Sequence, residues 1–192
     1  LDQLIKKEHS IAYRVTKDEA LDLPEQTFEN RYITLSPKER NIYDRLRRDS
    51  YAELADGGTI TATTVLTKLL RLQQFTGGFL VEDDAAKPQL VSTGKLDALS
   101  DILQDYVVEG KKKLVIFARF LPEVHEIERL CDKILGKQGM RSVAIYGEIK
   151  KEDRGGIVQQ FQTDPQTMVF IGQIDTAGTG ITLTAADTVV YY

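Results

Sequence analysis

The residues of this chain best suited to chemistry lie in a short glycine- and threonine-rich stretch near its end. The segment TAGTG places Gly178 and Gly180 on either side of Thr179, between an apolar run at 168–171 and a β-branched and aromatic run at 188–192. A strand, loop and strand of this kind present backbone N–H groups and hydroxyls at the carboxyl edge of a sheet, where open α/β folds bind phosphates. The stretch therefore predicts a phosphate-binding loop. Taken alone, a G-x-G pair is more typical of a plain tight turn.

The rest of the sequence argues against a self-contained active site. No G-x-x-x-x-G-K-[ST] phosphate loop occurs, and the run from Gly78 to Asp83, which ends in acidic residues, is too short for a Mg²⁺-binding strand. One cysteine, Cys131, and two distant histidines, His9 and His125, argue against a zinc site and a nucleophilic triad. We expect Cys131 in the core and His125 on the solvated side of its helix. We therefore expect no catalytic residue and no metal ligand in this chain.

Composition limits the class of protein. The chain has 192 residues, of which 42% are apolar, so it can bury a sizeable core. No apolar run approaches the roughly 18 residues of a membrane span, and a single cysteine fits a reducing compartment. We therefore expect a cytoplasmic protein with no membrane partner. A net charge of −4 argues against a broadly basic nucleic-acid surface, but it allows a local groove that contacts a few phosphates.

The second half of the chain must position the glycine-rich stretch, and its pattern is α/β. Continuously apolar runs at 113–118, 142–146 and 168–171 predict buried strands. They alternate with amphipathic helices, which we expect to begin at Ser92 or Thr93, near Pro122, and at Lys151. This alternation predicts a mainly parallel sheet that is covered on both faces.

The first half reads as a connector followed by two helices. The alternating run at 27–35 predicts a strand. Ser36 and Glu39 form a capping box with Pro37 between them, so we expect a helix from Ser36 to about Leu54. A second helix is expected at 61–75, ended by Gly77 and Gly78. We expect one region at 1–91, the connector and helical insertion, and a second at 92–192.

Four segments of the second half identify a family by their content and order. They are TGKLDALSDIL (93–103), KLVIFARF (113–120), IYGEIKKEDRGGIVQQFQ (145–162) and TAGTGITLTAADTVVYY (176–192). Together they resemble the second RecA-like lobe of SWI/SNF-type ATPases, which are helicase-like motors of superfamily II. Two further segments, 22–46 and 69–80, resemble the stretch that joins the family's two lobes. The resemblance implies a RecA-like three-layer fold preceded by a helical connector.

The resemblance also implies roles for individual residues. KLVIFARF is similar to motif IV and the last segment to motif V, and both are expected to contact the DNA backbone. The expected DNA-binding residues are Arg119, Phe120, Tyr146, Gly147, Gln173, Thr176 and Thr179; the expected nucleotide-cleft residues are Gly178, Gly180 and Asp187. Two alternatives stay open: Phe120 either stacks on DNA or packs against the core, and Asp187 is either a cleft contact or a turn former. Thr182 and the run 173–175 depart from the family's usual residues, which puts the exact DNA contacts in doubt.

The implied partners are those of a complete motor. In the full-length protein we expect ATP and Mg²⁺, double-stranded DNA and a first RecA-like lobe. The family's arginine-bearing motif VI and its first lobe are not in this sequence, so we expect a bacterial or phage-encoded fragment that binds no cofactor tightly and is inactive as an ATPase alone. The alternative is a non-catalytic interaction module with a degenerate lobe, which would lack positive potential at Arg119, Lys150 and Lys151.

Overall fold

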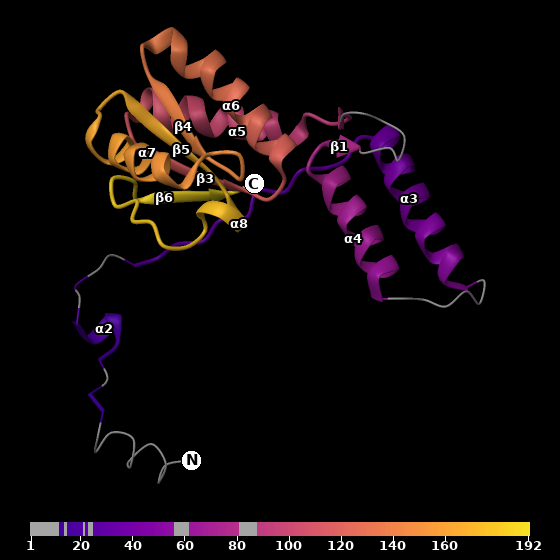
Figure 1. Ribbon diagram of the computed structural model, residues 1–192. Coiled ribbons are helices and arrows are strands. Elements are labelled where there is room, and N and C mark those ends of the chain that lie inside the picture. The colour runs from indigo at the N-terminus through magenta and orange to yellow at the C-terminus, as the bar shows by residue number, and fades with distance from the viewer. Residues whose placement is uncertain (1–11, 14, 21, 23–24, 56–61, 81–87) are drawn as a thin grey trace. The chain divides into compact units, whose positions relative to one another are not determined.

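Figure 1 shows a computed structural model of the chain, which describes residues 12–13, 15–20, 22, 25–55, 62–80 and 88–192. Two compact units are present, residues 1–32 and residues 33–192. The described part of the first unit contains one short helix, α2 (Lys17–Ala20). Everything that follows concerns the second unit. The region boundary expected at residues 91/92 follows family segments rather than compactness, and it stays a prediction.

A four-stranded parallel sheet lies at the centre of the second unit. Its order is β4-β5-β3-β6, and every neighbouring pair is parallel. The strands are β3 (Leu114–Ala118), β4 (Arg141–Ile145), β5 (Thr167–Gln173) and β6 (Thr188–Tyr191). Ile116 of β3 stands between Ile171 and Val190 of its two neighbours. The parallel α/β sheet predicted from the apolar runs is confirmed.

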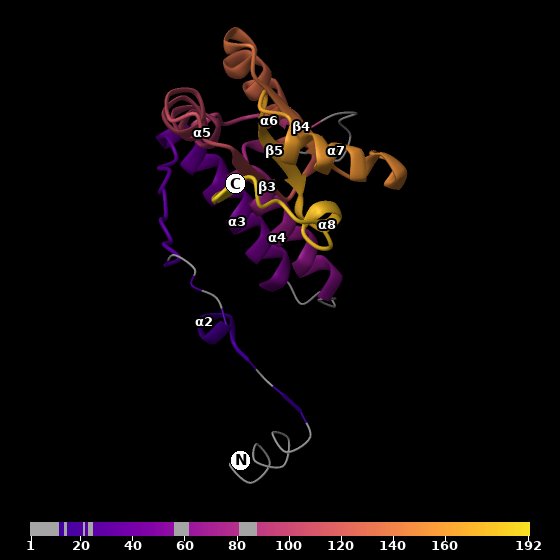
Figure 2. The same cartoon turned by 90° about the vertical axis from the view of Figure 1, so that its left-hand side faces the viewer.

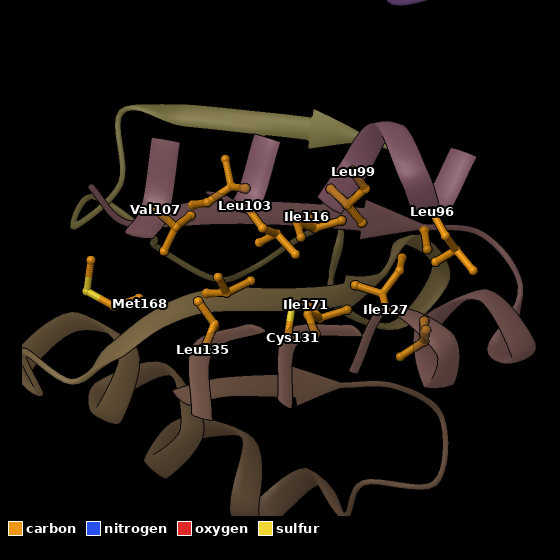
Figure 3. Packing of buried hydrophobic residues seen from close by; sticks show 14 of the residues in the cluster. Leu96, Leu99, Leu103, Val107, Ile116, Ile127, Cys131, Leu135, Met168 and Ile171 are labelled. Carbon is orange, nitrogen blue, oxygen red and sulfur yellow. The ribbon is translucent and has the colours of Figure 1, made fainter. Parts of the chain in front are cut away.

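Helices cover both faces of this sheet. On one face, α5 (Gly94–Ile102), the π-helix η1 (Leu103–Glu109) and α6 (Leu121–Leu135) bury a core with β3 and β5, shown in Figure 3. On the other face, α7 (Lys151–Thr163) buries Phe161 against Phe170, with ring centroids 5.6 Å apart. The expected three-layer arrangement is therefore present. A β5 strand buried on both faces explains its continuously apolar sequence.

Cys131 lies in the core, as expected. It is fully buried on α6, and burial raises the pKa of its thiol to about 12. At neutral pH the side chain is therefore a protonated, small hydrophobic group. None of the helices in the described ranges is long and apolar enough to cross a membrane.

Two antiparallel helices precede the lobe, as Figure 2 shows. They are α3 (Pro37–Ala55) and α4 (Ala62–Thr76), and Tyr43 packs on Phe75 with ring centroids 6.2 Å apart. The capping box is present: the Ser36 N–H donates to Glu39 Oε2 at 2.6 Å, and the Glu39 N–H lies 3.4 Å from Ser36 Oγ. A short hairpin of β1 (Phe79–Leu80) and β2 (Gln89–Leu90) follows. This hairpin was not predicted; Val81 to Asp83 and Thr61 lie outside the described residues.

The strand predicted at 27–35 is wrong. Residues 25–36 have no regular secondary structure, and nearly all of their side chains are exposed. An alternating sequence forms a strand only where a neighbouring strand takes its backbone hydrogen bonds, and the described residues offer none here.

The helix predicted from Ser92 or Thr93 to Gly110 is continuous but changes its winding. It begins as α5, with Thr93 at the N-cap, and widens into the π-helix η1 from Leu103. Gly110 ends it with a negative φ, and the left-handed position falls on Lys111, at φ 54°. A Cβ at Gly110 would lie 2.5 Å from the Tyr106 carbonyl oxygen, so glycine is needed here for space.

Candidate functional site

The parallel sheet brings most of the predicted site residues to one edge. Arg119 and Phe120 follow β3, Tyr146 and Gly147 follow β4, and Gln173 is the last residue of β5. Because the strands are parallel, their carboxyl ends meet at the same edge. Residues from three separated segments are therefore neighbours there.

The Gln173 side chain joins the ends of the strands on either side of it. Its Oε1 accepts a hydrogen bond from the Gly147 N–H at 3.1 Å, and its Nε2 lies 3.5 Å from the Arg119 carbonyl oxygen. The two turns that follow β3 and β4 are thereby held to β5. Gln173 organises the site, and its predicted contact with DNA stays a prediction.

Arg119 is exposed and is oriented by a residue of the preceding helix. Its Nη1 donates to Gln73 Oε1 on α4 at 2.8 Å, and its guanidinium lies over the Phe120 ring, 5.6 Å from the centroid. An arginine carries five N–H donors, so this arrangement aims the group without using up its hydrogen-bonding capacity. The sequence did not point to Gln73, because glutamine on a helix surface carries no signal of its own.

A buried carboxylate holds the backbone of the same turn. Glu123 is only 3% exposed, and its Oε2 accepts hydrogen bonds from the N–H groups of Arg119, at 3.1 Å, and Phe120, at 2.9 Å. Burial raises the pKa of this carboxyl, while the two backbone hydrogen bonds and the charges of Lys95 and Arg119 oppose the rise. The sequence analysis missed Glu123. Its signal was present, because a Glu at the third position of a helix with Pro122 in the first turn marks a capping box.

The Glu123 carboxylate also requires a glycine on the preceding segment. A Cβ at Gly77 would lie 2.0 Å from Glu123 Oε1, although the φ of Gly77 is not in the left-handed region. Gly77 therefore ends α4 with enough space for the carboxylate to approach. Gly78, at φ +98°, supplies the turn itself.

The two aromatic residues at this edge are only half exposed. Phe120 lines a cavity of about 240 Å³ together with Gln74, Phe79, Pro88, Leu121 and Pro122. This position favours the packing alternative for Phe120. Tyr146 meets the edge of the His125 ring, with centroids 5.3 Å apart. The expectation of a solvated His125 is therefore wrong, because the half-buried imidazole supports the Tyr146 ring.

The glycine-rich stretch forms an exposed loop above the same edge. Thr176 lies in the short helix α8 (Ile174–Ala177), Gly178 caps it, and Thr179 and Gly180 are exposed. Gly180 has a φ of +75°, and no atom lies within 4 Å of the position of a Cβ. The left-handed backbone explains the glycine, and the open space around it leaves room for a ligand to approach.

The segment after this loop is tied to α7 by a single side chain. Gln162 Nε2 donates to the Thr182 carbonyl oxygen at 3.1 Å, and Gln162 Oε1 accepts from the Ala185 N–H at 2.8 Å. The clamp fixes the loop's far side and leaves its tip exposed.

Asp187 does not join the other predicted cleft residues. It precedes β6, so it lies at the amino edge of the parallel sheet, opposite Gly178 and Gly180. Its carboxylate accepts hydrogen bonds from the Tyr106 hydroxyl and from Thr188 Oγ1, and Lys112 Nζ lies 3.9 Å away. The Tyr106 hydrogen bond is the main cause that lowers the pKa of Asp187. The nucleotide-cleft assignment of Asp187 is therefore corrected to the structural alternative.

The charge at the carboxyl edge is mixed. Lys150 and Lys151 follow β4 and are exposed, and among the described residues neither they nor Arg119 forms an ion pair. Glu148 and Glu152 are exposed beside the two lysines. Arg119 is thus the cation that the structure aims most clearly at this edge.

We predict that Glu123→Ala destabilises the chain by about 2 kcal/mol or more, because two buried N–H groups lose their acceptor. Glu123→Gln retains an acceptor oxygen and should cost less than about 1 kcal/mol. Because the folded-state pKa of Glu123 is raised, wild type should gain stability relative to Glu123→Gln as the pH falls from about 8 to about 5. Urea unfolding of the three proteins at several pH values measures both effects. A pH-independent difference between wild type and Glu123→Gln would contradict the burial of a charged carboxylate.

Comparison with known proteins places these features in a family. Residues 94–192, more than half of the chain, match the helicase conserved C-terminal domain. An uncharacterized ATP-dependent helicase of Mycoplasma genitalium is 25% identical over 99% of this chain, which spans 18% of that protein. Helicase SWR1 of Yarrowia lipolytica is 33% identical over 52% of this chain and 5% of its own length.

Solved structures show the same fold. The Sulfolobus solfataricus SWI2/SNF2 ATPase core in complex with double-stranded DNA superimposes with a TM-score of 0.70, at 24% identity, over 99% of this chain and 40% of that one. The C-terminal domain of the Sulfolobus solfataricus SWI2/SNF2 ATPase gives a TM-score of 0.67 at 23% identity, over 85% of this chain and 70% of that one. With the helicase match over the three-layer lobe, this chain belongs to the helicase conserved C-terminal domain family, and its lobe is the RecA-like C-terminal lobe of the SWI/SNF type.

Proposed function

We propose that this chain supplies part of the DNA-backbone track and one wall of the ATP cleft in a SWI/SNF-type ATP-dependent DNA translocase. The observation that carries the proposal is the convergence of Arg119, Gly147 and the exposed loop at 178–180 on one edge, where Gln173 holds the turns after β3 and β4 together. The DNA-bound Sulfolobus solfataricus relative of the same fold supports the choice of duplex DNA. The curated relatives that are ATP-dependent helicases support the use of ATP.

The residues at the edge divide the work by their chemistry. Arg119 places a permanent charge beside the Phe120 ring, and such a group binds a phosphate oxygen without reading sequence. The hydroxyls of Thr176 and Thr179 add neutral donors next to it. Tyr146 and Phe120 form the apolar walls of the track, while Gly178 and Gly180 let the loop backbone approach the nucleotide closely.

ATP hydrolysis itself requires a second lobe. The sequence has no phosphate loop, and within the described ranges no three His, Cys, Asp or Glu side chains gather where they could hold a metal ion. We therefore assign the Mg²⁺ ligands to a first RecA-like lobe of the same protein. This chain alone should bind ATP weakly and hydrolyse none. We place the protein in the cytoplasm of a bacterium or phage-infected cell, in line with its mycoplasmal relative.

We predict that Arg119→Ala weakens the binding of duplex DNA several-fold and lowers the slope of log K against log salt by about 0.9, the value expected for one phosphate contact. Arg119→Lys should restore most of the affinity, because it keeps the charge. Fluorescence anisotropy at a series of salt concentrations measures both quantities. Arg129→Ala is the matched control, since Arg129 is exposed on α6 and already paired with Glu126. Equal losses in the Arg119 and Arg129 variants would remove Arg119 from the track.

We predict that Gly180→Asn sharply reduces DNA-stimulated ATP hydrolysis by the full-length protein while it barely changes the melting temperature. Asparagine tolerates the left-handed backbone, and the space around Gly180 accepts its side chain, so the substitution adds bulk without strain. Gly139→Asn is the matched control, because Gly139 has a φ of +68°, equally open surroundings, and a position at the amino end of β4. If both variants keep full activity per folded molecule, the loop is only a turn.

A further inference from the structure

Helix α3 carries a charged face of one sign. From Pro37 to Arg48 its exposed residues are Pro37, Lys38, Arg40, Asn41, Arg45, Arg47 and Arg48, so five of these seven side chains are basic and none is acidic. The two acidic residues of this segment, Glu39 and Asp44, are half-buried, and Glu39 is engaged in the capping box. The opposite side of the helix packs on α4 through Tyr43.

Other exposed helix faces of this chain mix their charges. On α7, Lys151 is followed by Glu152 and Asp153, and on α6 the exposed Lys133 follows Asp132. Mixing of signs is what a merely solvated surface shows. The face of α3 stands out because it concentrates positive charge in a chain whose net charge is −4.

The cations of this face are available and regularly spaced. Within the part of the chain that the structure describes, Lys38, Arg40, Arg45 and Arg47 form no ion pair. Lys38 and Arg45 are seven residues apart, as are Arg40 and Arg47, so each pair forms a row of about 10.5 Å along the helix. Arg48 lies between the two rows.

We propose that this face of α3 is a second contact surface for the phosphate backbone of double-stranded DNA, separate from the track at the sheet edge. A helix about 10–12 Å wide fits a major groove about 12 Å wide, with one row of cations toward the phosphates of each strand. Arginine suits this role because its charge is permanent and its planar fork matches phosphate oxygens. The contact is independent of sequence, and it does not require that Arg119 bind DNA.

The surface is also connected to the site. Helix α4, which packs on α3, supplies Gln73, the hydrogen-bond partner of the Arg119 guanidinium. A duplex held on α3 therefore acts on a helix pair that contacts the cation of the proposed track.

The test compares two charge-matched double variants of the whole chain by fluorescence anisotropy with a labelled duplex of random sequence. Arg45→Gln/Arg47→Gln should weaken binding about tenfold or more at low salt and lower the salt slope by about 1.8, or about 0.9 for each lost contact. Lys133→Gln/Lys137→Gln removes the same charge from exposed positions at the end of α6 and should change affinity less than about twofold. Arg45→Lys/Arg47→Lys should restore most of the binding. Circular dichroism checks that each variant is folded.

Three results would overturn the proposal. Equal losses in the two glutamine variants would mean that only net charge matters, and no loss in either would remove α3 from DNA binding. If the arginine pair is required for a polyglutamate peptide but not for the duplex, the face recognises acidic protein instead. Arg119→Ala, measured in parallel, separates the two surfaces: a loss confined to it overturns the α3 contact alone, and a loss confined to the α3 variant overturns the track alone.

Discussion

The parallel pairing of β3 with β5 and β6, and of β5 with β4, is the constraint on which the rest of this lobe depends. It sends the turns after the strands to one edge, and it buries β5 on both faces, so the strand must be apolar throughout. The same rule separates residues that are close in sequence. Gly180 and Asp187 are seven positions apart, yet they lie at opposite edges because β6 begins between one of them and the sheet.

Strand direction alone does not fix the edge; three polar side chains do. Gln173 holds the turns after β3 and β4, Glu123 takes the N–H groups of the first of these turns, and Gln162 anchors the segment beyond the glycine loop. Each replaces hydrogen bonds that the backbone would otherwise make to water. The price of this order is a buried carboxylate with a raised pKa at Glu123, and a glycine at position 77 to make room for it. The tip of the loop, at Gly180, is left open to a ligand.

The sequence predicted what depends on local pattern. Apolar runs placed the strands of the sheet, the Ser36–Glu39 box placed the start of α3, and strand order placed Arg119 and Gly147 at a common edge. It could not show what depends on contacts between distant segments. The Tyr106 hydroxyl that engages Asp187, the His125 ring under Tyr146 and the approach of Glu123 to Gly77 all join residues that are far apart along the chain. The strand wrongly expected at 27–35 failed for the same reason, since a strand needs a neighbour that its own sequence does not reveal.

The central claim is that the carboxyl edge of the sheet faces DNA. Hydrogen–deuterium exchange of the chain with and without duplex DNA, read by peptide mass spectrometry, tests it most directly. The account predicts added protection in the turns at 119–120 and 146–147 and in the loop at 176–180, with little change at the amino edge around Gly139 and Asp187. Protection at the amino edge, with the carboxyl-edge turns unchanged, would contradict it.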